Sequence, residues 1–224
     1  MLFRSIGDPV SWLSWLGRGF GRLELDEARW VMVDVESTGL NVGTDALLAI
    51  AAVAMQVDWS RKRLSMRPSD SFEVLLRQKD ILSTKENIML HGIGVQAQQQ
   101  GLVPADAMRA FCTFVGKSPL LAFHAAFDRS LINKQLHALG LPRLRSPWVD
   151  VEHLCEVTHG NVKARSLDEW MAHFAIDCTH RHQAASDAFA QCEVLQRIWP
   201  VVREQCKGWA GLQRLASQRR WLAT

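Results

Sequence analysis

The sequence predicts an α/β fold in which helices flank a mixed sheet. Closely spaced strand patterns between residues 31 and 76 indicate an antiparallel meander. Beyond residue 104, helical patterns alternate with short strand patterns. Of the 224 residues, 48% are hydrophobic and 22% are charged, which fits one domain with short extensions and excludes long disorder.

The first predicted strands are rich in β-branched and small apolar residues. Val31, Val33 and Val35 recur at every second position, which is typical of a strand. A long apolar run beginning at Ala46 fits a buried strand. The expected strands are 31–36, 46–57, 64–66 and 72–76, with a turn at 58–63.

Helices and strands alternate in the second half. Ser166 and Glu169 form a capping-box sequence that begins a helix. Pro200 is expected to end the last helix, because proline lacks the N–H that continues the hydrogen-bond pattern. The expected helices are 105–115, 127–139, one beginning at Ser166, and 184–198, and the expected strands are 120–123 and 148–151.

Two short extensions are expected on either side of a central domain at 31–200. Residues 1–30 are predicted to be a helical N-terminal extension, with a Trp/Leu stripe and a second short helix at 24–29. Residues 201–224 form a short basic C-terminal tail, in which cationic and aromatic residues are interleaved. This pattern fits either a path for a single nucleic-acid strand or a helix that docks on the core through Trp209, and we favour docking.

Charge and cysteine usage limit the class of protein. A net charge of +3 excludes a histone-like binder and permits a locally basic groove for a polyanion. We expect no membrane partner, because the apolar runs are shorter than the roughly 18 residues of a spanning helix, and no signal peptide, because Asp8 and Pro9 interrupt the N-terminal apolar stretch. The five cysteines are scattered without a zinc-type spacing, which indicates a reduced, cytoplasmic protein.

Two carboxylates on the first predicted strand indicate a metal site. Asp34 and Glu36 are two residues apart, so both side chains leave the same face of the sheet. Carboxylates that are buried together repel each other unless a cation neutralises them, and their hard oxygen atoms suit Mg²⁺ or Mn²⁺. The alternative for this pair alone is a strand with a solvated polar face.

Further ionisable residues make the metal site the better interpretation. Asp128 follows a predicted strand at a helix start, where α/β sheets place their sites, although an acid there also favours the helix dipole. Small residues surround Asp187, which lets its helix approach the sheet, and His182 precedes that helix. Four acids and a histidine on separate elements fit a two-metal site for in-line attack on a phosphodiester, with His182 as general base.

The motifs resemble those of the DEDD superfamily of 3′–5′ exonucleases. The matching segments are similar to the histidine-containing (DEDDh) subgroup, and to the exonuclease domain of the DNA polymerase III epsilon subunit in particular. They occur in the order of that family from residue 31 to about 198. The three main motifs are 34–40, 123–128 and 182–188, and two weaker matches are 88–93 and 149–151.

The resemblance implies a ribonuclease-H-like fold with a mixed five-stranded sheet. It implies two divalent metal ions, Mg²⁺ or Mn²⁺, and a catalytic His182. The implied metal ligands are Asp34, Glu36, Asp128 and Asp187. The implied substrate-binding residues are Ser37, Thr38, Gly39, Leu40, His91, Ile93 and Phe127, the apolar ones through sequence-tolerant contacts with bases.

The implied reaction is hydrolysis at the 3′ ends of single-stranded DNA or RNA, which releases nucleoside 5′-monophosphates. DNA is favoured because it is the commoner substrate of the family. Ala125 replaces the asparagine common at this position, which affects substrate contacts rather than metal ligation. The alternatives are an exoribonuclease that trims RNA or degrades oligonucleotides, and a silent binding module. The presence of all four acids and the histidine favours an enzyme.

Overall fold

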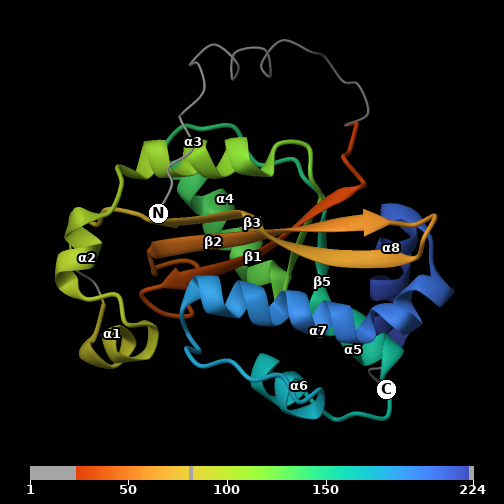
Figure 1. The fold of residues 1–224 in the computed structure, drawn as a ribbon. Coiled ribbons are helices and arrows are strands. Elements are labelled where there is room, and N and C mark those ends of the chain that lie inside the picture. The colour runs from red at the N-terminus through yellow and green to blue at the C-terminus, as the bar shows by residue number, and fades with distance from the viewer. Residues whose placement is uncertain (1–23, 81–82, 222–224) are drawn as a thin grey trace.

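The computed structural model describes residues 24–80 and 83–221, which form a five-stranded sheet between layers of helices (Figure 1). The Trp/Leu stripe predicted near the N-terminus lies outside the described residues. In chain order the elements are β1 (Arg29–Ser37), β2 (Leu47–Asp58), β3 (Arg63–Leu75), α1 (Lys85–His91), α2 (Val95–Gln100), α3 (Pro104–Val115), β4 (Leu120–Ala122), α4 (Ala125–Ala138), β5 (Trp148–Asp150), α5 (Val151–Thr158), α6 (Leu167–His173), α7 (Ala184–Gln205), α8 (Gly208–Ser217) and a short 3-10 helix (Gln218–Trp221).

The strand order is β3-β2-β1-β4-β5, which places β1 in the middle of the sheet. β1, β2 and β3 form the predicted antiparallel meander, and β4 and β5 add in parallel on the other side of β1. The mixed sheet therefore follows the expected pattern. Its parallel strands end on the same side as β1, which brings the start of α4 close to the end of β1.

The two strand pieces predicted at 64–66 and 72–76 are one strand. β3 pairs with β2 on both sides of an irregularity, where Ala54 lies opposite Arg67 and the adjacent Val53 lies opposite Ser71. The residues in between, which include Pro68, bulge out of the ladder. Proline has no N–H to donate to a neighbouring strand, so a bulge on an edge strand accommodates it.

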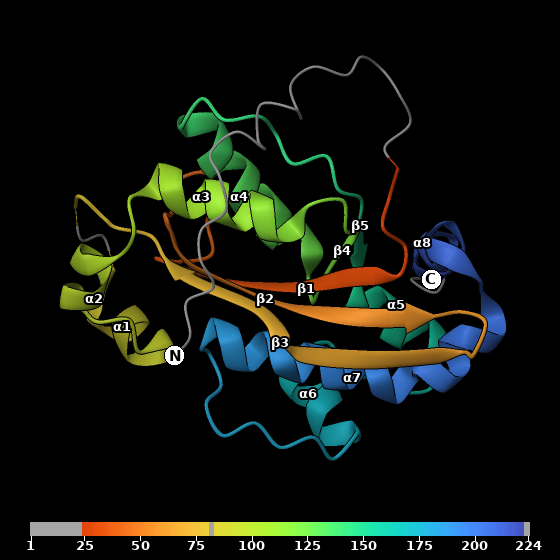
Figure 2. The ribbon, with the colours of Figure 1, turned by 45° about the horizontal axis from the view of Figure 1, so that its top comes forward.

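The alternation along β1 separates two apolar cores. Trp30 and Met32 pack with α5, α6, α7 and α8, whereas Val31 and Val33 pack with α3 and α4 on the opposite face. Figure 2 shows α3 and α4 on one side of the sheet, α6 and α7 on the other, and α8 at one end of it. Because Asp34 continues the row of even-numbered residues, it faces α7.

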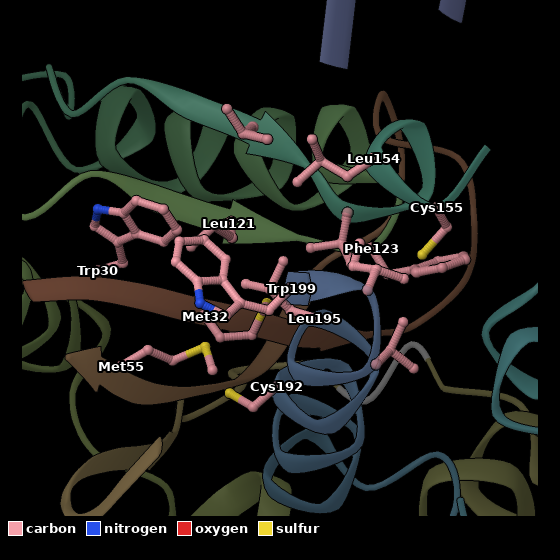
Figure 3. Packing of buried hydrophobic residues seen from close by; sticks show 14 of the residues in the cluster. Trp30, Met32, Met55, Leu121, Phe123, Leu154, Cys155, Cys192, Leu195 and Trp199 are labelled. Carbon is pink, nitrogen blue, oxygen red and sulfur yellow. The ribbon is translucent and has the colours of Figure 1, made fainter. Parts of the chain in front are cut away.

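Four tryptophans close one end of the α7 face. Trp30 lies 5.3 Å from Trp209, 6.0 Å from Trp199 and 5.9 Å from Trp59, measured between ring centroids. Figure 3 shows Trp30 and Trp199 beside Met32 and Leu195 in this core. Trp209 is buried on α8, so residues 208–217 dock on the core, the favoured alternative for the tail.

The prediction of a short helix at 24–29 is wrong. Asp26 donates its N–H to the Lys117 carbonyl, and the Val57 N–H donates to the Ala28 carbonyl. Apart from one turn bond from the Arg29 N–H to the Asp26 carbonyl, the main chain thus bonds to neighbouring segments, and Arg29 already belongs to β1. Long-range pairing overrides the weak helical pattern here.

The predicted end of the last helix at Pro200 is also wrong, because α7 continues to Gln205 with Pro200 inside it. Proline removes one intrahelical hydrogen bond. Trp199 and Val202 on either side are buried against the core, so their packing favours continuation of the helix. The capping box of Ser166 and Glu169 at the start of α6 is confirmed. Within the described residues, the helices are too short or too polar to cross a membrane.

Candidate active site

Asp34 and Glu36 lie near the carboxyl end of the central strand. Their partners on β2 are Ala51 and Ala49, whose small side chains leave space above the sheet. Both carboxylates point to the α7 face, beyond the apolar row of Trp30 and Met32. The strand therefore presents two acids where its apolar core ends.

Asp187 reaches these carboxylates from the first turn of α7. Its side chain is 6% exposed, and the flanking Ala184 and Ala188 are buried against the core. The ligand oxygens of Asp34, Glu36 and Asp187 all lie within 4.8 Å of one another. The small residues around Asp187 thus permit the close approach that the sequence predicted.

Asp128 lies beside this group on the first turn of α4 and is 4% exposed. It is not one of the three acids whose oxygens cluster within 4.8 Å. Burial is the largest cause of the raised pKa of Asp34 and of Glu36, and the negative charge of Asp128 is a smaller cause in both. The structure therefore brings all four predicted acids to one region, three of them in a tight group.

Burial and mutual repulsion perturb these carboxyl groups strongly. Burial first, and then the charges of Asp128, Asp187 and Glu36, hold the pKa of Asp34 well above its ordinary value. Burial and the charge of Asp187 raise the pKa of Glu36 to about 8. Burial is also the main reason that the pKa of Asp128 rises to about 8. Such a cluster retains protons unless a cation neutralises it.

Arg181 supplies part of that neutralisation. The Nη1 atom of its guanidinium contacts Oδ1 of Asp187, and its Nε contacts Oδ1 of Asp168. Its charge opposes the rise in pKa of Asp34 and Glu36. Sequence reasoning missed Arg181, although its place next to His182 was a signal.

His182 is held at the edge of the acid group by its backbone. Its N–H donates to Oδ2 of Asp187 at 3.1 Å, and its φ of 61° is a left-handed conformation that is unusual for histidine. Among the described residues, no hydrogen bond or ion pair engages its imidazole.

The loop after β1 is braced by its own polar groups. The Ser37 hydroxyl donates to the Gly39 carbonyl at 2.6 Å, and the Thr38 hydroxyl accepts the Ala46 N–H at 2.9 Å. A Cβ on Gly39 would lie 2.6 Å from Oδ2 of Asp45, so a larger residue here would displace the Asp45 carboxylate, which accepts the Asn41 N–H. Leu40 is 88% exposed at the tip. The two hydroxyls thus shape the loop, whereas Leu40 is open to a ligand.

His91 lies inside the protein rather than at its surface, with an exposure of 2%. Its Nδ1 accepts the Ile93 N–H at 2.9 Å, so Nε2 carries the proton and donates to Oδ1 of Asn87 at 2.9 Å. Asn87 in turn donates to the Ser37 carbonyl at 3.2 Å. These hydrogen bonds join α1 to the end of β1, and Ile93 is left half-exposed beside them.

Two further residues position the acids. Gln191, one turn after Asp187, donates from Nε2 to Oδ1 of Asp34 at 2.6 Å. Asp150 accepts the N–H groups of His124 and Ala125 at 3.1 and 2.9 Å, which caps the helix that carries Asp128. The four-residue spacing from Asp187 could have identified Gln191, and Asp150 belonged to a weaker motif.

Phe127 lies on the first turn of α4, half-buried against the Val35 side of the sheet. The predicted nucleotide-binding residues thus occupy the first turn of α4, the end of β1 with the loop after it, and the end of α1 with the segment after it.

Comparison with known proteins agrees with this geometry. A family model described as "Exonuclease" matches residues 31–195. The DNA polymerase III PolC-type proteins of Clostridium perfringens and Bacillus subtilis are 26% and 28% identical to this chain over 185 and 177 residues, which cover 83% and 78% of it. The chain spans 12% of the length of each of these two relatives.

Solved structures share the fold. A structure of exonuclease I has a TM-score of 0.65 at 13% identity, covering 80% of this chain and 44% of its own. Exonuclease X in complex with 5′ overhanging duplex DNA has a TM-score of 0.62 at 16% identity, covering 84% and 99%. E. coli exonuclease I in complex with a dA16 oligonucleotide has a TM-score of 0.63 at 13% identity, covering 80% and 43%. The ribonuclease-H-like α/β fold with a mixed five-stranded sheet is thereby confirmed. Since the family model covers well over half of the chain, and its motifs lie where the acids meet, this protein belongs to the exonuclease family, within the DEDD superfamily of 3′–5′ exonucleases.

Proposed function

We propose that this protein is a metal-dependent 3′–5′ exonuclease that releases nucleoside 5′-monophosphates from single-stranded 3′ ends. The observation that carries the proposal is the convergence of Asp34, Glu36 and Asp187, whose ligand oxygens lie within 4.8 Å of one another. The raised pKa values of Asp34 and Glu36 support it, because a cluster of buried acids without a cation is electrostatically unfavourable.

The donor set fits two hard divalent cations. Asp34, Glu36, Asp128 and Asp187 offer carboxylate oxygens, the ligands that Mg²⁺ and Mn²⁺ prefer. When bound, two such ions would activate the attacking water and stabilise the negative charge that develops on the phosphate and the leaving 3′ oxygen.

His182 takes the proton of the attacking water in this proposal. Its backbone bond to Asp187 holds it at the edge of the acid group, and its imidazole has no competing hydrogen bond among the described residues. A neutral imidazole is a suitable base near pH 7.

The terminal nucleotide binds above the loop after β1. Ser37, Thr38 and Gly39 shape this loop, and Leu40 contacts the base together with Ile93 and Phe127. His91 acts through Asn87, which holds the main chain of Ser37. The contacts are apolar and therefore tolerate any base sequence.

DNA is the favoured substrate. The similar proteins include DNA polymerases, and two of the solved structures were obtained with DNA. The catalytic unit comprises residues 31–200, with the segment before it and the C-terminal tail as accessory segments. All five cysteines are free thiols, which supports the cytoplasm as the site of action.

Cleavage of 5′-labelled single-stranded DNA and RNA of one sequence tests the proposal. Reactions contain Mg²⁺, Mn²⁺ or EDTA. The Asp106→Ala protein, which lacks an exposed acid on α3, serves as a control that should cleave like the wild type. A ladder that shortens from the 3′ end, requires metal and is faster on DNA is expected. Faster cleavage of RNA would identify an exoribonuclease, and binding without cleavage would identify a silent binding module.

A further inference from the structure

A groove lies along the exposed side of α4, the helix whose first turn carries Asp128. Its volume is about 660 Å³, and its polar lining includes Arg129, Ser130, Asn133, Lys134, His137 and Arg143. No carboxylate lines it. Most of these residues recur at a spacing of three or four along α4 and therefore share one face of that helix.

Two of the cations in this α4 groove are uncompensated. Arg129 and Arg143 are exposed, and within residues 24–80 and 83–221 neither makes a hydrogen bond or ion pair. By contrast, Arg29, Arg181 and Arg219 each pair with a carboxylate. Unpaired positive charges in a concave surface attract a polyanion.

Lys134 connects the α4 groove to the loop after β1. Its Nζ donates to the carbonyl oxygens of Gly43 and Asp45 at 3.0 and 2.9 Å. These neutral acceptors hold the side chain in place without cancelling its charge. The groove is therefore continuous with the loop whose tip carries Leu40.

The other side of the same helix carries Asp128. Ala126 and Arg129, from the same first turn of α4, line one end of the α4 groove, which extends from there to His137 and away from the acid group. From Arg129 to His137 the helix rises roughly 12 Å, at about 1.5 Å per residue. A stacked nucleic-acid strand advances about 3.4 Å per nucleotide, so this length spans more than one phosphate.

We propose that the α4 groove binds the sugar–phosphate backbone of the strand that leads away from the 3′-terminal nucleotide. This inference rests on the proposed exonuclease function and adds the path of the substrate. Arg129 and Arg143 pair with phosphates through their planar guanidinium groups, while Ser130 and Asn133 supply neutral polar contacts. DNA and RNA share this backbone charge, so the groove serves both.

The test compares three double variants of the full chain. Arg129→Gln with Arg143→Gln removes both charges, and Arg129→Lys with Arg143→Lys retains them. The matched control, Arg63→Gln with Arg67→Gln, makes the same charge change on β3. Arg63 lies opposite Asp58 of β2 in the strand register, at the other end of that strand from Ala49, the partner of Glu36. Melting temperatures verify that all three proteins fold.

The measured quantities are KM and kcat for a long single strand and for a dinucleotide, over a range of salt concentrations. For the long strand, the Gln pair is expected to raise KM about tenfold, as for two exposed charge contacts. It should also make the plot of log KM against log salt shallower by about 1.4, since each lost phosphate contact contributes about 0.7. The dinucleotide should be unaffected, and the Lys pair should resemble wild type.

An unchanged salt dependence in the Gln pair, or an equal change in the β3 control, would overturn the proposal. An acidic protein surface would then be the alternative ligand of the groove. If the wild type cleaves nothing, the proposed function fails separately. In that case, fluorescence anisotropy of the same labelled strands in EDTA measures whether the groove binds nucleic acid. A shallower salt dependence in the Gln pair alone supports it, and identical binding rejects it.

Discussion

Gln191 donates a 2.6 Å hydrogen bond from its side-chain nitrogen to Oδ1 of Asp34. Its side-chain oxygen accepts the Phe123 N–H at 2.9 Å, which fixes the orientation of the amide because the main-chain N–H can only donate. Gln191 is 1% exposed, so both bonds are shielded from water. One side chain on α7 thus connects the central strand with the end of β4, four residues after Asp187.

Replacement of this amide should loosen Asp34. Gln191→Met keeps a similar volume but leaves the buried Phe123 N–H unpaired, which costs about 1–3 kcal/mol of unfolding free energy. We also expect kcat to fall and the Mg²⁺ concentration for half-maximal activity to rise. Denaturant titration and metal-dependent kinetics measure the two effects. An unchanged unfolding free energy in Gln191→Met would contradict the assignment of that bond.

Neutralisation of Asp34 should separate stability from activity. Asp34→Asn retains the oxygen that accepts from Gln191 and removes one of the mutually repelling charges. In EDTA we expect a melting temperature equal to or above that of wild type, with no cleavage in Mg²⁺. Asp106→Asn on the surface of α3 is the control. A large loss of stability in EDTA would show that Asp34 is structural.

Metal binding should stabilise the wild type. A ligand at 100 times its Kd adds about 2.7 kcal/mol per site, which corresponds to roughly 5–10 °C in melting temperature for a chain of this size. Calorimetry with increasing Mg²⁺ measures the shift. Asp34→Asn should lose most of it, and an identical shift in both proteins would place the ion elsewhere.

Without metal, stability should fall as pH rises. The pKa of Glu36 rises from 4.5 to about 8 and that of Asp128 from 3.8 to about 8 on folding. The folded protein therefore binds more protons than the unfolded chain between about pH 4 and pH 8, so the unfolding free energy decreases through this window. Denaturant titrations in EDTA at several pH values measure the slope. Glu36→Gln should flatten it, and an increase of stability with pH would exclude these shifts.

Loss of the imidazole at residue 182 should affect turnover more than binding. His182→Ala is expected to lower kcat by roughly 10²–10⁴-fold, the usual contribution of a positioned general base, with little change in KM. His180→Ala, which removes a neighbouring exposed histidine, is the matched control. Steady-state kinetics on a single-stranded oligonucleotide distinguishes them. A change confined to KM would assign His182 to substrate binding.

Local patterns in the sequence predicted those features that depend on residues a few positions apart. The capping box of Ser166 and Glu169 begins α6, and the two-residue spacing of Asp34 and Glu36 puts both acids on one face of β1. Alternation along β1 and the apolar run of β2 likewise predicted the meander. These patterns are reliable because backbone geometry alone sets their periods and caps.

Only the tertiary structure decided how distant segments meet. Pro200 remains inside α7 because buried neighbours on both sides favour the helix, and Pro68 interrupts β3 as a bulge because β2 pairs on either side of it. The hydrogen bond of Gln191 with Asp34 joins α7 to β1 across 157 positions of the sequence. The sequence by itself determined which acids and which histidine are present and the local structure that carries each. Their convergence depends on the order of strands and on close helix–sheet packing, and both are determined by the free energy of the whole core.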